Sequence, residues 1–342
     1  MMIEYDEDLE KNSRIMEADP VNEDAYIKRA ELYLEKRNYE EAFKDFKRTI
    51  QINPNNANAY NGLGSIHFYK NEFDKAIEEF TKAISLDAHN MEFLINRGSS
   101  FKNKNELNKA FEDYNKAIEI NPNNSDIYDS RGNAFLYEQK YVKAIKDFTI
   151  SISLRPDRIE YYCDRGMAYY ENGDLGEALE DMESAIKINP NCAEAYNICG
   201  LIYCAKKQYD NAIESYTKAI EINSYFSDAY CNRGDTFYRQ GNYDMAIKDC
   251  TTAIEIDPND YIAYNNRGNA YQSKRKYDLA IEDYNKSIQI DPNDPITYNN
   301  RGYCYEKLRN KEKAIEDYKK AYELGDNRAK RNLNRILKSQ QT

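Results

Sequence analysis

Hydrophobic and small residues recur along this chain at the spacing of amphipathic helices, in pairs of segments joined by short polar turns. Residues 261–294 show the pattern. Tyr264 and Tyr271 share one face of a first helical segment, and Ala280 and Tyr284 share one face of a second segment after a polar turn. The pattern predicts a helical hairpin over these residues.

The same hairpin pattern recurs every 34 residues without an insertion or deletion. A fixed period of this size indicates a repeat protein and overrides chain length as a guide to domain count. Nine units are predicted, over residues 23–56, 57–90, 91–124, 125–158, 159–192, 193–226, 227–260, 261–294 and 295–328. Residues 7–20 match only the second helix of the unit, so residues 1–22 are predicted to form an N-terminal half-repeat or cap. Residues 329–342 are predicted to form a C-terminal capping helix and tail, because a terminal repeat needs a polar outer face.

Two positions of the unit are almost always small. The eighth position is glycine in eight of the nine units, and the twentieth is alanine in all nine. Glycine inside a helix costs about 1 kcal/mol relative to alanine, and a larger residue at the twentieth position would overpack by roughly 1 to 3 kcal/mol. The two helices of each hairpin are therefore predicted to approach closely at these positions.

A 34-residue hairpin with aromatic, glycine, alanine and proline residues at these spacings resembles the tetratricopeptide repeat. The resemblance covers residues 23–328. It implies an all-α, right-handed superhelical solenoid of nine helix-turn-helix units, whose first helices line a groove that binds segments of other proteins. The chain departs from the family pattern in having tyrosine where the family usually has tryptophan at the fourth position.

Arginine at the seventh position and aspartate at the twenty-third occur together in seven units. The pairs are Arg29 with Asp45, Arg97 with Asp113, Arg131 with Asp147, Arg165 with Asp181, Arg233 with Asp249, Arg267 with Asp283, and Arg301 with Asp317. In the other two units Leu63 accompanies Glu79 and Cys199 accompanies Ser215. Because the two positions change together within a unit, we predict an ion pair across each of the seven hairpins.

Charge and composition narrow the possible partners and compartments. Charged residues make up 31% of the 342 residues and the formal net charge is -11, which disfavours nucleic acid as a partner because such binding rests on clustered lysine and arginine. No apolar run is long enough for a membrane span and no secretion leader is evident. The seven cysteines lack any Cys-x-x-Cys pair, so reduced thiols and a cytoplasmic location are expected.

Candidate chemistry is sparse, since almost every residue has an assigned repeat position. His67 and His89 occupy unrelated positions of the unit, and no glycine-rich phosphate loop is present. The many carboxylates fit a solvated helix face. We therefore expect no catalysis, no cofactor and no metal site.

The candidate binding surface is the groove side of the first helices, at positions two, five, six, nine and twelve, which the family resemblance implies. In the last three units these positions are rich in amides. Asparagine carries donors and an acceptor, so a ladder of asparagines can hold the backbone of an extended peptide. The alternative is that asparagine is simply common here and faces solvent. The candidate peptide-binding residues are Asn232, Asp235, Tyr238, Asn265, Asn266, Asn269, Asn299 and Asn300.

The groove side of the first six units is more acidic, through Asp24, Glu92, Asp126, Asp129, Glu160, Asp164 and Glu194. This charge favours a basic or neutral partner at that end. The sequence as a whole predicts a non-catalytic scaffold that binds extended or helical segments of other proteins. The alternatives are a self-assembling structural solenoid and, with less support, a solenoid that binds single-stranded RNA.

Overall fold

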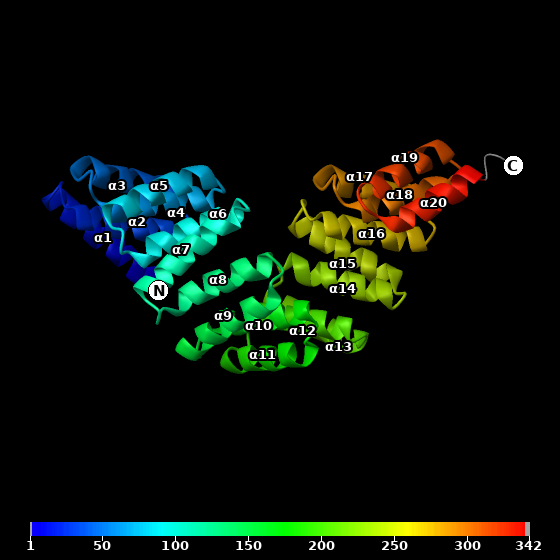
Figure 1. Ribbon diagram of the computed structural model, residues 1–342, viewed down its shortest axis with the longest axis horizontal. Helices are drawn as coiled ribbons and strands as arrows, with labels where there is room; N and C mark the ends of the chain where they lie inside the picture. The colour runs from blue at the N-terminus through cyan, green and yellow to red at the C-terminus, as the bar shows by residue number, and fades with distance from the viewer. Residues whose placement is uncertain (1, 339–342) are drawn as a thin grey trace. The chain divides into compact units, whose positions relative to one another are not determined.

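The computed structural model describes residues 2–338 and consists of twenty α-helices, with no strand among these residues (Figure 1). The all-α repeat architecture predicted from the sequence is confirmed. Residue 1 of the predicted N-terminal cap and residues 339–342 of the predicted tail lie outside the described residues. The chain divides into two compact units, residues 1–168 and 169–342, and the division falls inside one helix.

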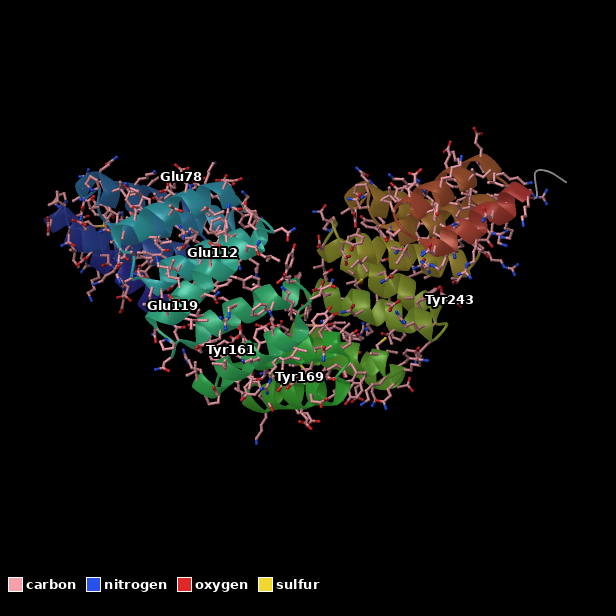
Figure 2. The ribbon with its side chains drawn as sticks, viewed as in Figure 1. Glu78, Glu112, Glu119, Tyr161, Tyr169 and Tyr243 are labelled. Carbon is pink, nitrogen blue, oxygen red and sulfur yellow. The ribbon has the colours of Figure 1, made fainter. Side chains whose placement is uncertain are left out.

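Unit 1 consists of consecutive helices that pack on their neighbours in the chain. Its helices are α1 (Met2–Ala18), α2 (Glu23–Glu35), α3 (Tyr39–Ile52), α4 (Ala57–Tyr69), α5 (Phe73–Leu86), α6 (Met91–Asn103), α7 (Leu107–Ile120), α8 (Ser125–Tyr137), α9 (Tyr141–Leu154) and the first part of α10 (Ile159–Asn172). The second helices turn a polar face outward, as the exposed Glu78 on α5 and Glu112 and Glu119 on α7 show (Figure 2).

Unit 2 continues the same succession of helical pairs. It holds the end of α10 and then α11 (Leu175–Ile188), α12 (Ala193–Ala205), α13 (Tyr209–Ile222), α14 (Ser227–Arg239), α15 (Tyr243–Ile256), α16 (Tyr261–Ser273), α17 (Tyr277–Ile290), α18 (Pro295–Lys307), α19 (Lys311–Glu323) and α20 (Asn327–Lys338). No helix within residues 2–338 is both long and apolar enough to span a membrane.

Most first helices begin after an asparagine or aspartate that caps them, whereas α12 and α14 begin after Cys192 and Phe226, whose side chains form no cap hydrogen bond. Asn56 precedes α4, and its side-chain oxygen accepts a hydrogen bond from the Ala59 backbone N–H at 3.0 Å. Asp260 caps α16 in the same way, through the N–H groups of Ile262 and Ala263. A helix leaves its first N–H groups without internal partners, so these side chains fix where the capped first helices start.

Small residues allow the two helices of a hairpin to come together. The alanine at the twentieth position is fully buried in all nine hairpins. At the eighth position, a side chain added at Gly98 would stand 2.8 Å from the ring of Tyr114, and one added at Gly268 would stand 2.7 Å from the ring of Tyr284. The predicted close approach is confirmed, and the aromatic ring of the second helix fills the space that glycine leaves.

The arginine and aspartate pairs form within hairpins, as the sequence predicts. In six hairpins the arginine Nε and Nη2 donate to the two carboxylate oxygens of the aspartate at 2.6 to 3.0 Å. Each of these aspartates is at most 5% exposed. Arg165 lies in unit 1 and Asp181 lies in unit 2, so the seventh pair stays a prediction.

Each arginine also reaches the preceding hairpin, which the sequence interpretation missed. Its Nη1 donates at 2.7 to 3.2 Å to a side-chain oxygen sixteen residues earlier in the chain. These acceptors are Ser13, Thr81, Asn115, Thr149, Thr217, Thr251 and Asn285. In the six hairpins with a described aspartate pair, the guanidinium therefore links three helices and stabilises the stacking of hairpins as well as the hairpin itself.

Helix α20 covers the last hairpin. Ala329 and Ile336 are buried, and Ile336 packs with Ala314 and Tyr318 of α19. On its polar side, Arg335 Nη2 donates to Glu306 Oε2 at 2.9 Å. These contacts shield the end of the hydrophobic core, which is the task of a terminal element in a repeat array.

The turn inside each hairpin predicts a stabilising substitution. Its central residue has a left-handed backbone, with φ of 58° at Arg275 and 81° at Gly241. A non-glycine residue in this region is strained by about 1 kcal/mol, so Arg275→Gly should raise the free energy of unfolding by about 0.5 to 1 kcal/mol. Urea unfolding followed by circular dichroism measures the change. Gly241→Ala is the matched control and should lower stability; equal effects of the two substitutions would contradict the explanation.

Candidate functional site

The candidate site lies on one side of the first helices, which we call the first-helix face and define as positions two, five, six, nine and twelve of each hairpin. With 3.6 residues per turn, these positions lie opposite positions four, seven and eleven, which face the second helices. Unit 2 places the predicted site residues on three helices. They are Asn232, Asp235 and Tyr238 on α14, Asn265, Asn266 and Asn269 on α16, and Asn299 and Asn300 on α18.

Amides of successive first helices bind one another. Asn300 Nδ2 donates to Asn269 Oδ1 at 2.9 Å and to Asn265 Oδ1 at 3.4 Å. Asn232 Nδ2 donates to Asn197 Oδ1 at 3.1 Å. The structure thus brings Asn265, Asn269 and Asn300 together, and it joins Asn232 to an asparagine that the prediction did not include.

The same register recurs with other partners. Asn266 Nδ2 donates to Cys231 Sγ at 3.6 Å, again from position six to position five of the preceding hairpin. In unit 1, Asn96 Nδ2 donates to Asn61 Oδ1 at 2.9 Å in this register. The described bonds engage the N–H side of these position-six amides. Their side-chain carbonyl oxygens remain the groups suited to accept a hydrogen bond from a peptide backbone.

Asn299 differs from the other predicted residues because α20 covers it. It is 8% exposed, and its Oδ1 accepts a hydrogen bond from Asn332 Nδ2 at 2.9 Å. Asn299 therefore has little surface to offer a partner. The sequence shows the polar residue at a groove position but not that the terminal helix lies over it.

Asp235 and Tyr238 are half-buried and already have neighbours on α14 and α15. Asp235 Oδ2 accepts a hydrogen bond from Arg239 Nε at 2.6 Å. The Tyr238 ring lies 5.7 Å from the ring of Tyr243, which Figure 2 labels on α15. Asp235 therefore carries a carboxylate already paired with a cation, and Tyr238 belongs to an aromatic pair.

The first-helix face of unit 1 carries carboxylates at close quarters. Burial raises the pKa of Glu31, and the neighbouring charge of Glu92 raises it further. Asp129 on α8 is at position five and Asp164 on α10 is at position six of the next hairpin, where other hairpin pairs have two asparagines, and both are half-buried. Burial, followed by the charge of Asp164, raises the pKa of Asp129 to about 8. The pair therefore holds a proton near neutral pH.

The groups around this carboxylate pair offset only part of its charge. Asn133 Nδ2 donates to Asp164 Oδ2 at 3.0 Å. Lys102 on α6 attracts both carboxylates, while its own burial lowers the pKa of its ammonium group. Asp129 Oδ1 is buried and has no hydrogen-bond partner among the described residues. The remaining charged and titratable neighbours are Asp126, Arg158, Glu160 and Tyr161.

Groups that could support chemistry do not gather in one place. Among residues 2–338, no three His, Cys, Asp or Glu side chains lie where they could hold a metal ion. Burial raises the pKa of the Cys304 thiol to about 12, and it raises the pKa of the Cys231 thiol well above its usual range. A thiol that stays protonated is a poor nucleophile and metal ligand.

The fold is a solenoid of helical hairpins, and the first-helix face is its candidate binding surface. The family model described as the tetratricopeptide repeat matches residues 227–260, 261–294 and 295–327. A model described as a TPR repeat matches residues 200–241, and one described as the ETO1 C-terminal domain matches residues 25–206. The chain belongs to the tetratricopeptide repeat family, a class of protein-interaction repeats. No curated protein matches its sequence.

Two solved structures illustrate what the fold is similar to. The crystal structure of the APC/C hetero-tetramer Cut9–Hcn1 matches with a TM-score of 0.63 and 19% identity, over 92% of this chain and 64% of that one. This chain thus spans just under two thirds of that chain's length. The crystal structure of YrrB, a TPR protein with an unusual peptide-binding site, matches with a TM-score of 0.44 and 22% identity, over 57% of this chain and 98% of that one.

Proposed function

We propose that this chain is a non-catalytic scaffold that binds extended segments of other proteins on its first-helix faces. The observation that carries the proposal is the recurring amide row, in which position six of one hairpin binds position five of the preceding one. These contacts hold the amides in fixed orientations along successive helices. A row of oriented amides suits the regularly spaced N–H and C=O groups of an extended peptide.

The two units are suited to different partner segments. In unit 2, Asn232, Asn266 and Asn300 support backbone recognition with little demand on the partner's side chains. In unit 1, the carboxylates of Glu31 and Glu92 favour a neutral or basic segment. The same negative charge disfavours nucleic acid, whose phosphates would be repelled. We further propose that the protein works in the cytoplasm without a cofactor.

The amide row predicts which substitutions weaken binding. Replacing Asn232, Asn266 and Asn300 together by alanine should weaken partner binding by at least about 10-fold, because each lost hydrogen bond costs about 0.5 to 1.5 kcal/mol. Affinity capture from lysate, followed by mass spectrometry, identifies the partners of the original chain. Titration of an identified partner segment then measures the loss.

The matched control changes the same residue type at exposed turns of unit 2. Asn191, Asn259 and Asn293 are exposed and lie between hairpins, so their replacement by alanine should leave partner binding unchanged. Equal binding by both triple variants would remove the amide row from the proposal. Light scattering at two protein concentrations tests the alternative of self-assembly, which would show as a mass that rises with concentration.

A further inference from the structure

The α12–α13 hairpin has a cavity where seven of the other eight hairpins hold an arginine. This cavity has a volume of about 650 Å³ and is lined in part by Tyr196, Tyr203, Glu214, Ser215 and Glu221. A volume of this size falls in the range of small-ligand sites, about 300 to 1,000 Å³. Cys199 takes the place of the arginine, and Ser215 takes the place of its aspartate partner.

The α18–α19 hairpin shows what normally fills this space. The guanidinium carbon of Arg301 lies 5.5 Å from the ring centre of Tyr298 and 5.9 Å from that of Tyr305. Its Nε and Nη2 bind the carboxylate of Asp317, and its Nη1 donates to Asn285 Oδ1 at 2.7 Å. Two rings, a carboxylate and an oxygen of the preceding hairpin thus form a complete guanidinium site.

The α12–α13 hairpin keeps most of this site without its own guanidinium. Tyr196 and Tyr203 stand at the two ring positions and both line the cavity. Ser215 supplies a hydroxyl at the aspartate position. Cys199 is only 7% exposed, and its short side chain cannot reach the space that an arginine would fill. The aromatic part of the guanidinium site is therefore intact and open.

The charge around the cavity also suits a cation. Sixteen residues before Cys199 the chain has Glu183, whereas the hairpins with an arginine have serine, threonine or asparagine at this place. Burial raises the pKa of Tyr203, and nearby groups that include the Glu183 and Glu214 carboxylates raise it further. Glu221 lines the cavity and pairs with Lys218 at 3.2 Å. The Arg233 guanidinium donates to Thr217 at the cavity wall but is paired with Asp249. The Glu183 and Glu214 carboxylates therefore leave an excess of negative charge for an incoming cation.

We propose that this cavity binds the guanidinium group of an arginine side chain supplied by a partner protein. The planar group would lie against the rings of Tyr196 and Tyr203 and donate hydrogen bonds to Glu183 and Ser215. Lysine fits less well, because an ammonium group is a compact point charge that cannot stack along a ring. The site is on the opposite side of α12 from the first-helix face, so it does not depend on the function proposed above.

The test uses the full chain and a minimal probe, N-acetyl-arginine methylamide, measured by ligand-observed NMR and isothermal titration. We expect saturable binding with a Kd on the order of 1 mM, as is usual for one small anchoring group. The citrulline analogue has nearly the same shape without the charge and should bind at least about 10-fold more weakly. Glu183→Gln should weaken arginine binding by about 3- to 10-fold.

The decisive variant restores the residues of the other hairpins. The double substitution Cys199→Arg with Ser215→Asp would fill the cavity with the chain's own ion pair, so arginine binding should be lost while the circular dichroism spectrum is unchanged. If this variant does not fold, Cys199→Leu copies Leu63 of the α4–α5 hairpin and should also reduce binding. Absence of saturable binding to the original chain, equal binding of citrulline, or full binding by the filled variants would each overturn the proposal.

Discussion

Replacing Arg267 by leucine is expected to lower the free energy of unfolding by about 3 to 5 kcal/mol, because the substitution leaves a buried carboxylate without its partner. Arg267 donates to Asp283 at 2.9 and 2.7 Å and to Thr251 Oγ1 at 3.1 Å. Asp283 is only 5% exposed, so water cannot replace the lost bonds. Urea unfolding at pH 7, followed by circular dichroism, measures the loss.

The pH dependence of the stability loss in Arg267→Leu shows whether the loss comes from an unpaired carboxylate or from lost packing contacts. Burial raises the pKa of Asp283, and Arg267 opposes that rise. Without Arg267 the folded pKa rises further. A carboxyl group with a raised folded pKa contributes stability below its unfolded pKa of about 3.9 and loses it as the pH rises. The cost of Arg267→Leu should therefore be largest near pH 7 and smaller near pH 4.

A second substitution gives the matched control. Adding Asp283→Ala to Arg267→Leu removes the stranded charge, so the double variant should be more stable than the single variant at pH 7. Both variants lack the guanidinium contacts with the Tyr264 ring and Thr251. A double variant that is less stable than Arg267→Leu at pH 7 would mean that packing, not charge, sets the cost.

The sequence predicted this pair because its two members vary together inside one chain. Where arginine is absent, as at Leu63 and Cys199, the aspartate is absent too. The third partner was also visible in the sequence: the residue sixteen places earlier is Lys47 or Glu183 in these two cases and a neutral hydroxyl or amide residue in the others. Covariation of positions seven and twenty-three does not reveal this contact, because it joins position seven of one hairpin to position twenty-five of the hairpin before it.

Contacts between hairpins also explain why the candidate site in the structure differs from the site predicted from the sequence. The sequence indicates asparagines at positions five, six and nine, but it does not reveal the register in which one hairpin stacks on the next. That register joins Asn300 to Asn265 and Asn269, and it places Asn299 beneath α20. Patterns of period 3.6 assign a residue to a helix face. They do not give its partner on a neighbouring helix.

The same register brings Asp129 and Asp164 together and predicts an unusual pH dependence of stability in unit 1. In its folded state Asp129 has a pKa raised to about 8, first by burial and then by the charge of Asp164. Its unfolded pKa is about 3.9. Since the folded value is the higher one, the folded state favours the protonated form. The pair's contribution to stability is therefore complete below about pH 4 and is lost as the pH rises through about 8.

Asp129→Asn is expected to remove this loss, because an amide cannot ionise and its Nδ2 can donate a hydrogen bond to the Asp164 carboxylate. The variant should be more stable than the original chain by about 1 to 3 kcal/mol at pH 8 and nearly equal to it at pH 4. Urea unfolding across this pH range measures both slopes. Glu112→Gln removes an exposed carboxylate of α7 and should keep the original slope. An unchanged slope in Asp129→Asn would show that the pair is ionised throughout, and that Lys102 balances its charge.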